Sequence, residues 1–326
     1  DNVNDFFATL SSFLWGWPMI VLLLGTHVFL TVRLRFPQRK LFTAIRISVQ
    51  RDKSQKGDVS QFGALATALA ATIGTGNIIG VATAVALGGP GAVFWCWLTG
   101  VFGISTKYSE ALLAIKYRVK SESGRMLGGP MYTLERGLGW RKMGMLFAVF
   151  TAIAAFGIGC TVQANAISTI MHASYGISTE VSGGVLMLLS AAVIIGGVRS
   201  VSKVCSMLVP LMALLYVLGC IFILCVNAGY VMPALRLIVC SAFSPQAAGG
   251  GFAGASVIMA ARYGIARGLF SNESGLGSAP IVAAAARTKN PVRQALVSST
   301  GTFWDTVVIC AIIGLVIVSS MIADPA

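Results

Sequence analysis

The chain has 326 residues, of which 56% are hydrophobic and 11% are charged, whereas roughly a quarter of the residues in a soluble domain are charged. This composition excludes a soluble globular domain and predicts an all-α polytopic membrane protein with the lipid bilayer as its solvent. The net charge of +13 does not indicate a nucleic-acid partner, because the basic residues cluster in the gaps between hydrophobic segments.

Eight hydrophobic segments have about the 20 residues that a helix needs to cross a bilayer. In chain order we expect them at residues 13–34, 62–86, 92–116, 142–171, 181–198, 204–227, 252–285 and 292–320. Polar residues and glycines interrupt the second and the seventh. Two amphipathic segments, 41–47 and 232–239, are expected to lie in the plane of the membrane.

The positions of Lys and Arg predict the orientation of the spans. Eight of them lie at residues 33–56 and seven at residues 116–142, and the gaps on the opposite side carry only Arg236. Because basic loops stay in the cytoplasm, the amino terminus is expected outside.

The second segment is interrupted in its middle by Gly74-Thr75-Gly76-Asn77. Glycines allow a helix to unwind, but unwound backbone in lipid leaves peptide groups unpaired unless something polar binds there. The N–H groups that begin the following half-helix suit a carboxylate, and the carbonyls that end the preceding half suit a cation. Taken alone, the motif is equally typical of close helix packing.

The second interruption, residues 268–277, places several polar residues within the seventh segment. Polar side chains at membrane depth are costly and usually face a cavity or a partner. We expect Glu273 to pair with Arg262 or Arg267 rather than to carry protons. Phe270 is expected to form a wall of a small site.

Two further segments carry candidate ligands. Phe156 and Gln163 share one face of the fourth segment, where Gln163 would accept from a substrate ammonium or bond another helix. In the eighth segment Thr302, Asp305 and Thr306 form a polar cluster, and Asp305 is interpreted as a structural acid or an ion ligand.

The sequence does not predict an enzyme or an ATP-driven pump. It lacks the serine-hydrolase elbow, the zinc-protease motif and the phosphate-binding loop. The seven cysteines are interpreted as small apolar helix residues, and His27 and His172 are too isolated for a metal cluster. Lys107 and Glu110, three residues apart, are expected to pair with each other.

The two interrupted segments belong to an internal repeat. An amphipathic segment, an interrupted segment and a helix with a Phe-Trp pair follow one another twice, with the pairs at Phe94-Trp95 and Phe303-Trp304. The interrupted segments cross in opposite directions, so the repeats are inverted. Inverted repeats with paired broken helices are typical of secondary transporters.

Residues 88–110 begin Gly-Gly-Pro-Gly-Ala-Val-Phe-Trp-Cys-Trp and end Lys-Tyr-Ser-Glu, and they resemble the signature of the alanine or glycine:cation symporter family, the sodium:alanine symporters. Both interruptions also resemble that family. Cys96 and Ser105 depart from the methionines that are usual in the signature. The resemblance covers essentially the whole chain.

The resemblance implies a leucine-transporter-type fold of two inverted five-helix repeats in one transmembrane domain, residues 1–326. An extra helix at 13–34 would precede the first repeat, 62–227, and the first two helices of the second repeat would occupy 252–320. The last three core helices would then be absent. We therefore expect a C-terminally incomplete chain, either a fragment or a truncated protein.

The resemblance also implies a secondary active symporter of a small neutral amino acid, alanine or glycine, in the bacterial inner membrane. Sodium, or a proton, would be the coupling ion, and no other cofactor is expected. The residues expected to bind the substrate are Gly74, Thr75, Gly76, Asn77, Phe156, Gln163, Gly268, Phe270, Ser271 and Asn272. Those expected to bind sodium are Asn77, Asn272, Thr302 and Asp305. The alternative is a membrane-embedded amino-acid-binding sensor or an inactive truncated transporter.

Overall fold

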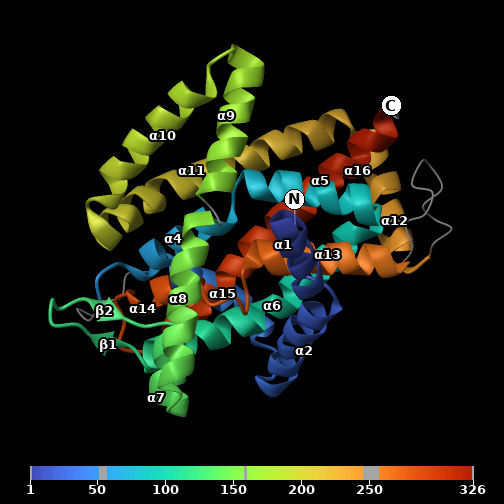
Figure 1. The fold of residues 1–326 in the computed structure, drawn as a ribbon. Helices are drawn as coiled ribbons and strands as arrows, with labels where there is room; N and C mark the ends of the chain where they lie inside the picture. The colour runs from blue at the N-terminus through green and yellow to red at the C-terminus, as the bar shows by residue number, and fades with distance from the viewer. Residues whose placement is uncertain (1, 51–56, 158–159, 245–256, 325–326) are drawn as a thin grey trace.

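The computed structural model describes residues 2–50, 57–157, 160–244 and 257–324, which fold almost entirely into helices (Figure 1). The all-α prediction is therefore confirmed. Two short strands, β1 (Val119–Lys120) and β2 (Met126–Leu127), form an antiparallel hairpin.

The helices follow the predicted hydrophobic segments closely. In chain order they are α1 (Asn2–Leu14), α2 (Trp17–Arg33), the 3-10 helix η1 (Pro37–Lys40), α3 (Leu41–Ser48), α4 (Gln61–Thr72), α5 (Thr75–Gly88), α6 (Gly91–Lys116), α7 (Pro130–Leu138), α8 (Arg141–Gly157), α9 (Thr161–Tyr175), α10 (Thr179–Ile194), α11 (Gly197–Val226), α12 (Ala228–Phe243), α13 (Val257–Asn272), α14 (Ala279–Ala284), α15 (Pro291–Thr302), the π-helix η3 (Phe303–Cys310) and α16 (Ala311–Ala323). Residues 252–256 of the seventh predicted span lie outside the described part of the chain.

Helix α6 lies at the centre of the bundle, in contact with α2, α12, α13 and α15. Its polar side chains Thr99, Ser105 and Thr106 are all buried. Helix α13 packs closely against it, because a Cβ atom at Gly268 would overlap the Thr99 hydroxyl. Small residues that allow such close approach are the usual means of helix association in membranes.

Within the described residues, four ranges are apolar and long enough to cross a membrane: Asn4–Arg33, Arg141–Tyr175, Gly197–Val226 and Pro291–Ala323. The pair α4 and α5, bent by 46°, makes a fifth. These account for five of the eight predicted spans, and α6, α10 and α13 correspond to the other three. Helix α6 carries buried polar residues, while α10 and α13 have only 16 residues each, so length and composition alone do not identify them.

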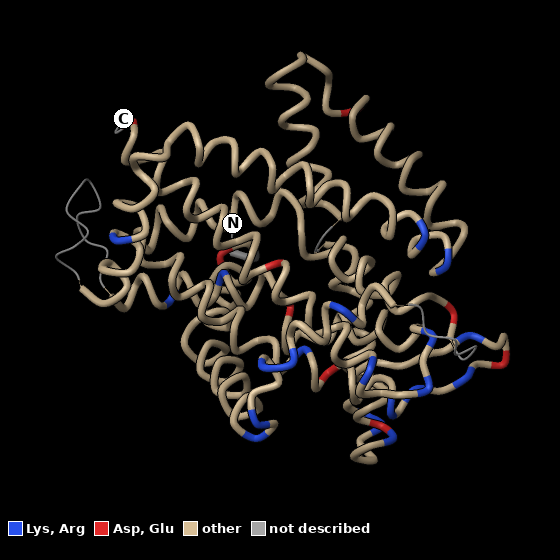
Figure 2. Tube along the Cα trace, turned by 180° about the vertical axis from the view of Figure 1, so that it is seen from behind, with Lys and Arg blue, Asp and Glu red and all other residues tan. Residues whose placement is uncertain are grey.

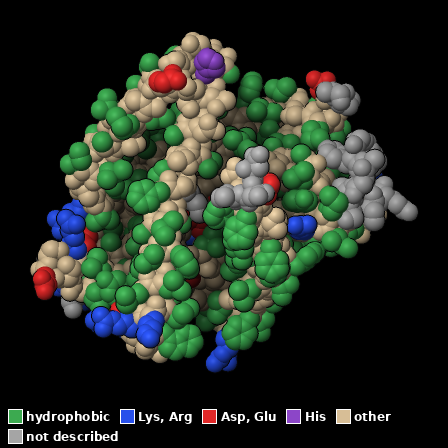
Figure 3. Space-filling model, viewed as in Figure 1, with side chains coloured by type: hydrophobic (Ala, Val, Ile, Leu, Met, Phe, Trp, Pro, Cys, Tyr) green, Lys and Arg blue, Asp and Glu red, His purple; other side chains and the backbone are tan. Residues whose placement is uncertain are grey.

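The outer surface of the bundle is strongly apolar. Large hydrophobic side chains of α8, α10 and α11 are exposed, and green side chains cover much of the face in Figure 3. Many Lys and Arg gather instead on the side of the molecule that carries the β-hairpin (Figure 2). A surface with an apolar body and a basic end is what a membrane protein requires.

The hydrophobic core surrounds the first helix break. Leu69 and Val85 from the two half-helices pack in one buried cluster with Val297, Ile309 and Ile313 from the last predicted span. The core therefore holds the bent pair against the helices that carry the Asp305 region.

Candidate functional site

The first interruption lies where it was predicted, with its boundary slightly earlier. Helix α4 ends at Thr72, Ile73 and Gly74 are extended, and α5 begins at Thr75. Gly76 and Asn77 thus belong to the first turn of α5 rather than to unwound backbone. The first N–H groups of a helix have no partner within it, so the amino end of α5 presents free donors at the break.

Gln163 of α9 reaches this break. The Thr75 hydroxyl donates a hydrogen bond to Gln163 Oε1. A Cβ atom built on Gly74 would lie 3.1 Å from Gln163 Nε2, so a side chain at that position would force the amide away. The structure therefore brings together Gly74, Thr75, Gly76 and Gln163, four residues that the sequence predicted to bind one ligand.

Asp305 lies in a second polar cluster, fully buried beside the first turn of α5. Its Oδ1 accepts a hydrogen bond from Asn77 Nδ2 at 2.7 Å. Its Oδ2 accepts from the hydroxyls of Ser271 at 2.8 Å and Thr306 at 2.7 Å. Among the described residues, no Lys or Arg forms an ion pair with this carboxylate.

The π-helix η3 carries Asp305 and Thr306. A single π-helical segment within an α-helix widens the backbone and is frequent at functional sites. At the end of η3, the Cys310 sulfur lies 3.5 Å from Asn77 Nδ2 and 3.3 Å from Ser271 Oγ. The sequence interpreted Cys310 only as a small apolar residue, and it offered no signal for the π-helix.

The second interruption begins later than predicted. Helix α13 continues through Gly268 to Asn272, and the turn before α14 occupies residues 273–278. Glu273, Gly275 and Gly277 have φ values of 51°, 91° and 84° in this turn. The prediction that the break starts at Gly268 is wrong, because that glycine serves close helix packing instead.

Asn272 and Thr302 lie in a separate cluster from Asp305. Asn272 Oδ1 accepts from the Ser274 N–H at 2.9 Å, and the Ser274 and Thr302 hydroxyls are 3.0 Å apart. The buried Asn272 Nδ2 has no hydrogen-bond partner in the described structure. The four predicted sodium ligands are thus divided into two pairs, Asn77 with Asp305 and Asn272 with Thr302.

Lys107 and Glu110 do not pair with each other, in contrast to the prediction. Lys107 Nζ donates to the carbonyl of Asn272 at 2.8 Å, and Glu110 Oε1 accepts from the N–H of Gly277 at 3.2 Å. Both side chains leave α6 to stabilise the turn after α13. Peptide groups of this turn form hydrogen bonds with both side chains. The spacing of Lys107 and Glu110 in the sequence does not reveal these bonds.

Arg267 joins the two interrupted helices, a contact that the sequence did not predict. Its Nη2 donates to the Gly76 carbonyl at 2.7 Å. Glu273 does not pair with an arginine as expected, because its carboxylate accepts from the Ser278 hydroxyl. The sequence carried one signal for the Arg267 contact, namely an arginine at membrane depth, because such a side chain needs a hydrogen-bond acceptor from another segment.

The two predicted aromatic walls lie apart. Phe270 packs edge-on against Trp15, with ring centroids 5.5 Å apart, and its ring also faces the Arg267 guanidinium. Phe156 is 82% exposed at the end of α8. Phe156 therefore does not form the wall of an enclosed site in the described structure.

Comparisons with known proteins identify relatives along the whole chain. The sodium:alanine symporter family profile matches residues 1–326. The chain is 52% identical to the sodium/alanine symporter AgcS of Methanococcus maripaludis, over 95% of this chain and 69% of that protein. It is also 52% identical to an uncharacterized transporter of Haemophilus influenzae, over 97% of this chain and 70% of that protein. A putative sodium/proton-dependent alanine carrier protein of Bacillus subtilis, YrbD, is 39% identical, over 94% of this chain and 62% of that protein.

Proposed function

The chain belongs to the sodium:alanine symporter family, and on that premise we propose that it is a secondary active symporter of alanine or glycine, coupled to sodium by alternating access. Family membership and the names of the relatives support sodium-coupled amino-acid symport and a transporter rather than an enzyme. The observation that carries the proposal is the position of one helix break. Its first turn contacts Gln163 through Thr75 and Asp305 through Asn77.

The substrate carboxylate would bind at the amino end of α5. The N–H groups of Thr75 and Gly76 and the positive end of the helix dipole attract an anion there. Gln163 would orient the ammonium group through its Oε1 atom, which the Thr75 hydroxyl already contacts. A neutral amino acid matches this arrangement, because it presents one charge of each sign within a short distance.

Sodium would bind at Asp305. A hard cation prefers oxygen ligands, and the carboxylate has the hydroxyl oxygens of Ser271 and Thr306 beside it. One carboxylate without an ion-pair partner among the described residues balances one monovalent cation. The pair Asn272 and Thr302 is the weaker candidate, because within the described structure no carboxylate hydrogen-bonds to either residue.

Alternating access would follow from an inverted repeat of the leucine-transporter type. In this proposal the first five-helix repeat occupies residues 62–227 and begins with the interrupted helix of α4 and α5, and the first two helices of the second repeat occupy residues 252–320 and begin with the interrupted helix of α13 and α14. The hydrogen bond from Arg267 to Gly76 joins the two interrupted helices at the proposed site. The basic loops support a protein that lies in the plasma membrane of a bacterium with its amino terminus outside.

Radiolabelled alanine uptake into proteoliposomes tests the proposal. We expect accumulation above equilibrium when sodium is placed outside and none when potassium replaces it. Equal uptake in both conditions would overturn the coupling to sodium. Saturable alanine binding without uptake would instead favour the amino-acid-binding sensor.

A further inference from the structure

A cavity of about 960 Å³ lies at the basic end of the molecule, away from the proposed transport site. It lies where α6 ends, where α11 and α15 begin and beside the β-hairpin. The charged side chains that line it are Lys116, Arg118, Lys120, Arg199, Lys289 and Asp58. Five cations therefore surround one carboxylate.

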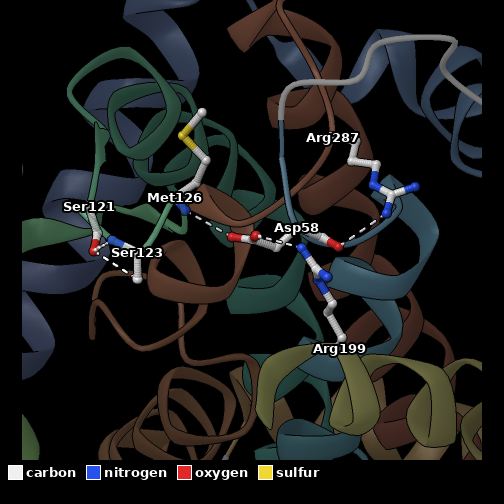
Figure 4. Close-up of polar contacts among 6 residues, drawn as sticks. All are labelled: Asp58, Ser121, Ser123, Met126, Arg199 and Arg287. Carbon is white, nitrogen blue, oxygen red and sulfur yellow. Dashed lines mark hydrogen bonds and ion pairs between the residues drawn. The ribbon is translucent and has the colours of Figure 1, made fainter. Parts of the chain in front are cut away.

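Asp58 neutralises only a small part of this charge. It is buried, and its Oδ2 accepts from the Met126 N–H at 2.8 Å (Figure 4). Its Oδ1 lies 3.7 Å from Arg199, while Arg287 donates to its backbone carbonyl at 3.5 Å. Asp58 thus has its partners already, and among the described residues that line the cavity no other carboxylate balances the remaining four positive charges.

Arg118 is a half-buried residue of the cavity wall. Its guanidinium donates to the carbonyls of Ala284 and Ala286 at 2.9 and 2.8 Å and to that of Thr288. Carbonyls satisfy its hydrogen bonds but do not cancel its charge. Burial lowers the pKa of Arg118, yet a guanidinium still remains protonated at neutral pH.

Lys120 and Lys289 complete the wall from the hairpin and from the turn before α15. Both side chains are exposed, and within the described residues neither has an ion-pair partner. Like charges held close together without an anion repel one another, so the arrangement is unfavourable until a counter-ion binds. Their ammonium groups are therefore free to meet a ligand.

We propose that this cavity binds the phosphate group of an anionic phospholipid headgroup at the cytoplasmic surface of the membrane. The ends of α6 and α15 that border it are the cytoplasmic ends of predicted spans, so the cavity lies at headgroup level. Basic pockets at the cytoplasmic ends of membrane helices attract anionic headgroups, and lysine binds phosphate as a point charge. Free inorganic phosphate offers the same chemistry from solution.

A bound phosphate would add to the contacts that already join the segments around the cavity. Val59 and Ala286 form an isolated parallel bridge beside the cavity, and Asp58 connects that bridge to the hairpin and to α11. An anion shared by Lys120, Lys289 and Arg199 would add a second connection among the same elements. The ligand would therefore stabilise this end of the protein by mass action.

The test measures the melting temperature of the detergent-solubilised protein during titration with three probes. These are dioctanoyl phosphatidylglycerol, dioctanoyl phosphatidylcholine and inorganic phosphate. The pocket variant is Lys120→Gln/Lys289→Gln, and the control is Arg136→Gln/Lys142→Gln. The control removes two exposed basic residues of the helices α7 and α8, outside the cavity.

We expect phosphatidylglycerol to raise the melting temperature of the wild-type and control proteins, with phosphatidylcholine far weaker. The pocket variant lacks two basic residues. If each of them contributes to binding what a basic residue typically contributes near an anionic membrane surface, the variant should bind phosphatidylglycerol about thirtyfold more weakly. A response to inorganic phosphate that is lost in the pocket variant would confirm the phosphate site and assign it to a soluble ligand. No response to either anion, or equal responses in the pocket and control variants, would overturn the proposal.

Discussion

Replacing Asp305 by Asn removes the carboxylate charge of the proposed sodium site while keeping its shape. Asn77 and the hydroxyls of Ser271 and Thr306 donate to the native carboxylate. In the variant, the Asn77 amide can rotate by half a turn and accept a hydrogen bond from the new amide nitrogen. The new amide oxygen can then still accept from both hydroxyls, so the hydrogen bonds that residue 305 makes are kept.

The cost to folding should therefore be small compared with the cost to sodium binding. A hydrogen bond to a neutral acceptor is about 1 kcal/mol weaker than one to a charged acceptor, but the variant no longer buries a charge. For sodium, a unit charge at about 4 Å contributes on the order of 4 kcal/mol at an effective dielectric constant of 20. Even half of that value corresponds to an affinity loss of about thirtyfold.

The assay is the sodium dependence of alanine uptake into proteoliposomes. For Asp305→Asn we expect the half-saturating sodium concentration to rise at least thirtyfold, or uptake to lose its dependence on sodium. Asp5→Asn removes an exposed carboxylate of α1 and should behave like the wild type. A variant that melts like the wild type and keeps its sodium dependence would refute the assignment of Asp305 to the ion.

Three further substitutions separate the roles of nearby residues. Gln163→Ala should raise the KM for alanine about tenfold without changing the half-saturating sodium concentration, and a selective change in the sodium response would contradict its role. Gly268→Val should lower the free energy of unfolding by roughly 1–3 kcal/mol or more in denaturation experiments, because the new side chain would overlap Thr99. Unchanged stability would argue against close packing at this position. Arg267→Met removes the donor to the Gly76 carbonyl and should slow alanine uptake more than it weakens alanine binding. Normal uptake by this variant would show that the contact is dispensable.

The sequence predicted the positions of the helices because hydropathy and helix length are local properties. It also predicted the first interruption within one or two residues, since glycines flanking Thr75 weaken the helix at that point. The second interruption was misplaced because glycines have two uses in membrane helices. Gly268 allows close packing on α6, whereas Gly275 and Gly277 adopt the positive φ of a turn.

Side-chain partners were much harder to predict, because they depend on which segments meet. Spacing on a single helix suggested that Lys107 would pair with Glu110, but the nearest acceptor for Lys107 comes from residue 272 in another segment. Helical spacing likewise placed Phe156 on the face of Gln163. The described structure instead leaves Phe156 82% exposed, whereas Gln163 contacts Thr75 at the first break.

The position of Asn77 gives the proposed coupling a physical basis. Thr75 and Asn77 lie two residues apart in the first turn of α5, one bonded to Gln163 and the other to Asp305. If sodium binds at Asp305, the carboxylate must share its oxygens between the ion and the Asn77 amide, so the first turn of α5 has to adjust. The donors for the substrate carboxylate belong to that same turn, and the substrate must therefore respond to the ion. By thermodynamic reciprocity the amino acid then changes the affinity for sodium by an equal factor, which is the condition for their joint transport.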